Sequence, residues 1–174
     1  TLLTKRTLND STIAVTIGAR KGTYKDMPAN RRYTLKLVAS TVPASVKIDG
    51  TETAYTYDGN NLSVLINIAD TDCAKEKTVT IAFPQNATPV ADGLIGKFRH
   101  IQQGCVALKN SNPGFVFNEQ LGTMESTGVA ISYAPQEAEQ RIEAFRRNYA
   151  NLKQVLLESG LEEAETDKFI QKAY

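Results

Sequence analysis

The sequence predicts an α+β protein: an antiparallel β-sandwich of about six to eight strands, followed by a small helical C-terminal region. Short runs of alternating apolar and polar residues fill residues 1–88, and turn-forming residues separate them. After residue 89, apolar residues instead recur every three or four positions. We therefore expect two domains, an accessory sandwich over residues 1–88 and a helical extension over residues 89–174.

The strands are expected where the alternation is strictest. These runs are residues 1–7, 12–18, 33–39, 45–49, 54–57, 62–68 and 77–83. Asn9-Asp10-Ser11 reads as a turn, and the Asp-Gly pairs at residues 49–50 and 58–59 predict tight hairpins. A polar loop is expected over residues 70–76. Because the first run begins without a turn, we expect the chain to continue upstream.

The helices are expected where apolar residues repeat in steps of four and three. The first helix begins near the candidate N-cap Asp92 and carries Leu94, Phe98, Ile101, Cys105 and Leu108 on one face. Residues 110–134 lack such a period, so we expect a long loop that hides a short element or is mobile.

A second helix is expected over residues 137–156. It follows Pro135 at the first helical position, and Gly160 is its C-cap candidate. Residues 161–174 form a last short helix, with Phe169 and Ile170 as its apolar contacts.

Composition excludes several classes of partner. The formal net charge of +1 leaves no basic surface for nucleic acid. No apolar stretch approaches the roughly 18 residues of a membrane span. Two cysteines cannot build a disulfide framework, so we expect Cys73 and Cys105 to be free thiols.

Catalytic, cofactor and metal motifs are not evident in the sequence. His100 is the one histidine, and no motif supplies a nucleophile or an orienting acid for it. We expect a surface or helix-packing role for His100. It lies five positions from Cys105, and such residues do not share a helix face, so the pair does not predict a metal site. The acidic residues at 58–61 and 70–72 read as turn formers rather than calcium ligands.

Tyr55 and Tyr57 are the candidate carbohydrate-binding residues. They lie two positions apart, so on a strand they point to the same face. An exposed pair would offer rings on which a sugar can stack, whereas a buried pair would belong to the core. We favour the core or a domain interface and keep sugar binding as the alternative.

Residues 13–38 resemble the C-terminal β-sandwich region of glycoside hydrolase family 31, which contains α-glucosidases and α-xylosidases. That region carries Gly-x-aromatic-x-Gly-Met after a strand, and then an Arg-x-aromatic pair that opens the next strand. The matching residues are Gly22, Tyr24, Met27, Arg31 and Tyr33. Asp26 stands where the family often has glycine, and Asp tolerates left-handed backbone better than most residues.

Beyond this segment, the Val-Lys-Ile-Asp-Gly hairpin and the Tyr-x-Tyr-Asp strand follow the family's order, so the similarity covers about the first half of the chain. Family members carry their catalytic aspartates on a (β/α)8 barrel upstream of this region. The resemblance therefore implies a non-catalytic accessory region of a retaining α-glycosidase, with no catalytic residue, no cofactor, and an intramolecular contact with the upstream catalytic domain. In a bacterial glycan-degrading enzyme, the expected location is periplasmic or secreted.

Two alternatives stay open from the sequence alone. One is a carbohydrate-binding module that takes α-linked glycans. The other is a cell-surface interaction sandwich, which is motivated only by fold analogy.

Overall fold

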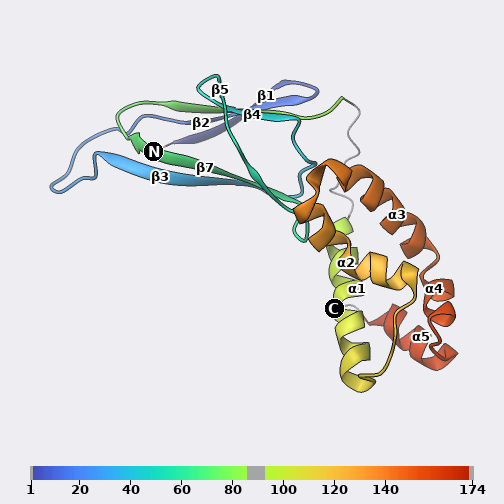
Figure 1. Cartoon of the computed structure of the whole chain (residues 1–174). Coiled ribbons are helices and arrows are strands. Elements are labelled where there is room, and N and C mark those ends of the chain that lie inside the picture. Colours follow the sequence, from blue (N-terminus) through green and yellow to red (C-terminus); the bar gives the residue numbers. More distant parts are fainter. Residues whose placement is uncertain (1, 86–92, 173–174) are drawn as a thin grey trace. The chain divides into compact units, whose positions relative to one another are not determined.

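The computed structural model describes residues 2–85 and 93–172 and has the predicted α+β content, with two antiparallel sheets followed by helices (Figure 1). The chain divides into two compact units. The sandwich unit comprises residues 1–57 and 63–89, and the helical unit comprises residues 58–62 and 90–174. The turn at residues 58–62, which we expected within the sandwich, thus belongs to the helical unit.

Two sheets lie one over the other in the sandwich unit (Figure 1). One has the strand order β1-β2-β8-β4-β5 and the other the order β3-β7-β6. The strands are β1 (Leu3–Asn9), β2 (Thr12–Ile17), β3 (Asn30–Leu37), β4 (Ser45–Ile48), β5 (Thr51–Glu52), β6 (Thr56–Asp58), β7 (Ser63–Asp72) and β8 (Lys77–Ala82).

The sandwich core comes from alternate residues of the central strands. The buried members are Val15, Ile17, Val46, Val79 and Ile81 from the larger sheet, and Val64, Ile66 and Ile68 from the smaller one. Within the larger sheet, the strand register places these buried side chains opposite one another, since Val79 pairs with Val15 and Ile81 pairs with Val46. Complete burial of one such side chain stabilises the fold by about 1.5–3 kcal/mol.

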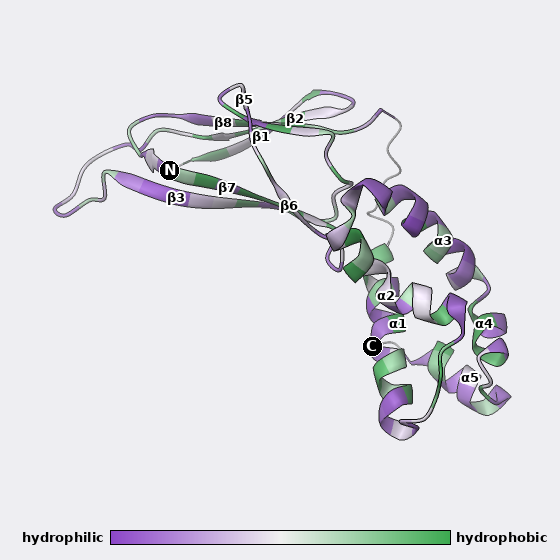
Figure 2. Ribbon diagram, in the orientation of Figure 1, coloured by the Kyte–Doolittle hydropathy of each residue, from purple (hydrophilic) through white to green (hydrophobic). Residues whose placement is uncertain are grey.

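Two of the edge strands, β1 and β3, contribute little to this core. All seven residues of β1 are exposed, and β3 alternates between exposed and half-buried residues. Figure 2 shows the same contrast, because β7 is largely hydrophobic whereas β3 is hydrophilic near its start.

Some strand limits differ from the sequence-based expectation. β3 begins at Asn30 rather than residue 33, and β7 continues to Asp72, which lies within the loop expected over residues 70–76. These extensions pair with each other, Asn30 with Asp72 and Arg31 with Thr71. Because backbone hydrogen bonds need no apolar side chains, this ladder continues beyond the apolar alternation that predicted it.

The two Asp-Gly turns adopt different conformations. Asp49 and Gly50 have φ values of 48° and 83°, which confirms the predicted tight hairpin with two left-handed residues. At residues 58–59 the same prediction is wrong. The turn there is wider, and its left-handed residue is Leu62, with φ 44°.

The helical unit contains α1 (Leu94–Ser111), α2 (Glu119–Tyr133), the 3-10 turn η1 (Pro135–Glu137), α3 (Ala138–Ala150), α4 (Leu152–Glu158) and α5 (Glu163–Gln171). The predicted first helix is confirmed as α1, although its candidate cap Asp92 lies outside the described residues. The single helix expected over residues 137–156 is divided at Asn151, which separates α3 from α4.

Helix α2 corrects the loop expected over residues 110–134. Asn118 caps it, since its side chain accepts a hydrogen bond from the Leu121 amide at 2.9 Å. Its buried face consists of Leu121, Met124, Thr127, Gly128 and Ile131. Two of these five residues are not apolar, which explains why the apolar period was not visible in the sequence.

Aromatic side chains fill the centre of the helical unit. Phe98 and Phe145 pack edge to face, with ring centroids 4.6 Å apart, and both are buried. Phe169 of α5 is buried, as expected, and its ring lies against Gly104 of α1. Ile170, expected as a second apolar contact, is instead 38% exposed. Gly160 follows α4 with φ 90°, in agreement with its predicted C-cap role.

Candidate functional site

The connection between β2 and β3 carries the residues of the family resemblance. Gly22 and Asp26 have φ values of 78° and 62°, so both take left-handed backbone. Asp26 therefore takes the conformation that makes glycine suitable at this position. The Met27 amide donates to the Tyr24 carbonyl at 3.3 Å and closes a turn that contains Asp26.

Cys73 ties together the two ends of this connection. Its carbonyl accepts from the Arg20 amide at 2.7 Å, and its own amide donates to the Ala29 carbonyl at 2.8 Å. The Arg20 guanidinium also donates to the Pro28 carbonyl at 2.9 Å. The base of the connection is thus closed by backbone bonds on both sides, while the Tyr24 ring at its tip is 59% exposed.

The remaining signature residues lie on or near β3. Met27 and Tyr33 are half-buried, and Arg31 is exposed at an irregular point in the β3–β7 register. Gly22 and Tyr24 precede β3, whereas Arg31 and Tyr33 lie on it, so the segment is a turn that leads into a strand.

Tyr55 and Tyr57 are anchored by their hydroxyl groups. The Tyr57 hydroxyl donates to the Ser40 carbonyl at 2.7 Å, and its residue is 2% exposed. The Tyr55 hydroxyl donates to the Pro43 carbonyl at 2.6 Å, and that ring is half-buried, which raises its pKa. A sugar could stack on Tyr57 only if the tyrosine ring moved out of the core. In this structure Tyr57 is therefore a core residue, which is the role that we favoured from the sequence.

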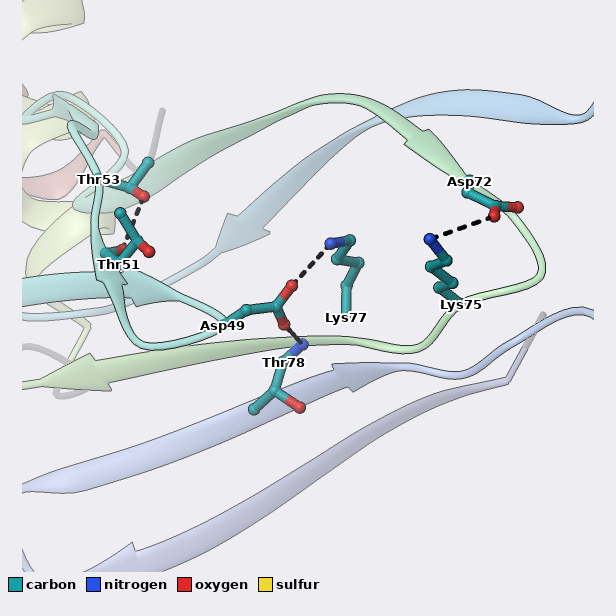
Figure 3. Close-up of polar contacts among 7 residues, drawn as sticks. All are labelled: Asp49, Thr51, Thr53, Asp72, Lys75, Lys77 and Thr78. Atoms are coloured by element: carbon teal, nitrogen blue, oxygen red, sulfur yellow. Dashed lines mark hydrogen bonds and ion pairs between the residues drawn. The ribbon is translucent and has the colours of Figure 1, made fainter.

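A polar cluster surrounds the β4–β5 hairpin (Figure 3). The Asp49 carboxylate accepts from Lys77 Nζ at 2.7 Å and from the Thr78 amide at 2.9 Å. The Lys77 bond and then the Thr78 bond lower the pKa of Asp49 below its ordinary value. The Asp49 amide also donates to the Thr78 carbonyl at 2.8 Å. Asp49 therefore fastens the hairpin to β8, which is a structural role.

The nearby ion pair between Lys75 and Asp72 is of a different kind. Its atoms are 3.9 Å apart and the side chains are 75% and 43% exposed (Figure 3). Pairs of this exposure contribute about 0–1 kcal/mol to stability. The Asp72 carboxylate also accepts from the Ala74 amide at 2.9 Å, in agreement with the turn-forming role expected for this acidic residue.

His100 takes the helix-packing role expected from the sequence. Its Nε2 lies 2.9 Å from the Phe169 carbonyl and its Nδ1 lies 2.8 Å from the Tyr149 hydroxyl. A carbonyl can only accept a hydrogen bond, so Nε2 carries the proton and, in the neutral ring, Nδ1 accepts from Tyr149. His100 thereby links α1 to α3 and α5.

Both cysteines are buried and free, as the sequence predicts. Burial, and then the negative charge of Glu125, raise the pKa of Cys105 to about 12. A thiol of this kind is not a nucleophile near neutral pH, because the thiolate is the reactive form.

Within residues 2–85 and 93–172, no group of three or more His, Cys, Asp or Glu side chains could hold a metal ion. Over the same residues, no helix is long and apolar enough to cross a membrane.

The turn Asp58–Leu62 makes contacts that the sequence did not predict. It bonds to α1 through Gln102 and Arg99 and to α2 through Ser132. These partners are 38 to 73 positions away along the chain, so no local pattern could have identified them. Gly128 lies in the interior of α2, where a glycine costs stability unless close packing requires it.

A scan against protein-family models and a search of curated proteins gave no match to this sequence. The resemblance to glycoside hydrolase family 31 therefore depends on the quoted sequence residues alone.

Proposed function

We propose that this chain is a non-catalytic accessory region of a retaining α-glycosidase of the glycoside hydrolase family 31 type, and that it stabilises a catalytic barrel that precedes it. The observation that carries the proposal is the backbone of the β2–β3 connection. Gly22 and Asp26 are left-handed at the two positions where the family pattern has glycine. The departure at Asp26 is thus compatible with the family's turn, and this supports the proposed relationship.

The hairpin that follows offers a second point of support. Asp49 and Gly50 form the tight turn that the family's Val-Lys-Ile-Asp-Gly order leads us to expect. Asp49 and Tyr57, which also fit that order, bond to neighbouring backbone. The structural roles of Asp49 and Tyr57 support the proposal of an accessory domain.

The first test is the mass of the endogenous protein that carries this sequence, measured by top-down mass spectrometry. We expect a species several times larger than 19.1 kDa, with an α-glycosidase barrel upstream of these residues. A mature species near 19.1 kDa would rule out the proposal and leave an independent binding or interaction module.

The second test removes this region from the larger protein. We expect the shortened enzyme to lose solubility or melt at a lower temperature, although its active-site residues are intact. A matched pair of variants, Asp26→Gly and Asp26→Val, would locate the effect, because glycine adopts the left-handed conformation freely and valine does not. An unchanged melting temperature and activity after removal would contradict the stabilising role.

A carbohydrate-binding module is the second candidate, because the Tyr55 ring is only half-buried. Calorimetry with maltooligosaccharides and xyloglucan fragments separates it from the first. Binding that is lost in Tyr55→Ala would favour it, and an absence of heat at millimolar ligand would exclude it.

A further inference from the structure

We propose that helices α1 and α2 form a binding site for the turn Asp58–Leu62, and that this contact makes the folding of the helical unit depend on strands β6 and β7. The turn is assigned to the helical unit by its contacts, although it connects two strands directly. The helical unit is therefore completed by a segment that lies far upstream of its helices.

Side chains of both helices bond to the turn. Gln102 of α1 donates to the Asn60 side-chain oxygen at 2.8 Å, and the Gly59 amide donates to Ser132 Oγ of α2 at 2.8 Å. Ser132 is itself oriented by a bond to the Gly128 carbonyl at 3.0 Å. The turn thus presents two acceptors to α1, the side-chain oxygens of Asn60 and Asn61, and one donor to α2, so both helices must be in place to satisfy it.

Two glycines allow the backbones to approach closely. A β-carbon added at Gly128 would overlap the Asn60 side chain and lie 2.9 Å from its Cα. A β-carbon added at Gly59 would overlap the Gly128 carbonyl and lie 2.8 Å from Cβ of Ile131. No real β-carbon tolerates such separations from backbone, so both positions require glycine as long as the turn is bound.

Leu62 anchors the end of the turn. Its side chain is completely buried, yet its backbone is left-handed at φ 44°, a conformation that costs a branched residue free energy. Its Cα groups with the helical unit. Burial of the side chain offsets the backbone strain.

The sharpest test compares two glycines of the same helix in the full chain. Gly122→Ala adds a β-carbon that meets only Cβ of Phe117 at an ordinary 3.9 Å, so the better helix former should raise the melting temperature by about 2–4 °C. Gly128→Ala makes the same chemical change against Asn60 and should lower it. If both variants shift the melting temperature upward, the turn does not need this site and the proposal is wrong.

A milder pair of variants reports on the contact itself. Ser132→Ala removes the acceptor of the Gly59 amide, whereas Ser126→Ala removes a hydroxyl that bonds only within its own helix, to the Gly122 and Thr123 carbonyls. We expect hydrogen exchange at Gly59 to accelerate at least about tenfold in the first variant and to stay unchanged in the second. Equal exchange rates of the Gly59 amide in the two variants would show that Ser132 does not hold the turn, and the proposal would be wrong.

The dependence on β6 and β7 has its own measurement. In the unaltered chain we expect the slowest amide hydrogens of residues 56–66 and of α2 to exchange by the same global opening, at equal rates. In Gly128→Ala the exchange rate of residues 56–66 should differ from that of α2. If the rates already differ in the unaltered chain, or stay equal in Gly128→Ala, the proposed coupling is refuted.

Discussion

Tyr57→Phe removes one hydroxyl from the sandwich core and leaves the ring in place. The hydroxyl donates to the Ser40 carbonyl at 2.7 Å, and Tyr57 and Ser40 are both buried. Water cannot easily replace this donor. The variant therefore loses a hydrogen bond and leaves the carbonyl without its phenol donor, which costs about 1–3 kcal/mol. For a unit of fewer than about 100 residues, we expect the melting temperature to fall by at least about 4 °C.

Calorimetry and urea unfolding would measure this effect. The urea midpoint should fall while the m-value stays constant, because the amount of surface exposed on unfolding does not change. Tyr55→Phe is the matched control. Its hydroxyl also donates to a carbonyl, but the half-buried site lets water take its place, so the cost should stay below about 1 kcal/mol. Equal and negligible shifts in the two variants would refute the structural role of the Tyr57 hydroxyl.

Three further outcomes follow from the structure. Asp49→Asn should lower stability at neutral pH and reduce the acid dependence of stability, because the bond from Lys77 lowers the pKa of Asp49 below its ordinary value in the folded state. The stability that the Asp49 carboxylate contributes is present above the pKa of Asp49 in the unfolded chain, and it is lost as the pH falls through the pKa of Asp49 in the folded chain. The free energies of unfolding of the variant and the parent should therefore converge in acid. Phe145→Ala should cost about 3–5 kcal/mol, since the ring is fully buried and lies 4.6 Å from Phe98 between centroids. Cys105 should react with iodoacetamide about a thousandfold more slowly in the native chain than in urea, because its pKa is raised to about 12.

The first two of these outcomes have a control variant within the chain. Asp10→Asn changes one exposed charge on the β1–β2 turn and should leave the acid dependence of stability as it was. Val106→Ala truncates a 57% exposed side chain on α1 and should change stability by less than about 0.5 kcal/mol. Peptide mapping assigns the label to Cys105, and rapid labelling of the native chain there would contradict its burial.

The sequence predicted the sandwich strands well because their burial is periodic. Val64, Ile66 and Ile68 alternate with polar or less buried residues, so the pattern of β7 follows directly from which side faces the core. The turn at Asp49-Gly50 was predictable for a local reason, since few residue pairs accept two consecutive left-handed conformations. The start of β3 and the end of β7 were not predictable from the sequence, because only backbone pairing defines them.

The helical unit was harder to predict because part of its packing uses small and polar residues. Thr127 and Gly128 face the interior of the unit, and neither adds to an apolar count. The apolar residues keep their spacing of three and four positions across Asn151. The sequence therefore predicted α3 and α4 as one helix. The bonds from Gln102 and Ser132 to the turn join residues 42 and 73 positions apart, and no single sequence marks such pairs.

The discontinuous helical unit has a consequence for synthesis on the ribosome. Polymerisation adds about 5–20 residues per second, and Gly128 is made about 70 residues after the Asn60 that it accommodates. Residues 58–62 are therefore made seconds before Gly128 and Ser132 of α2. During that interval the turn lacks its contacts to α2, although Leu62 ends in a fully buried position. Nascent chains stalled before α2 should consequently recruit chaperones at this turn, and chains stalled well beyond Ser132 should release them.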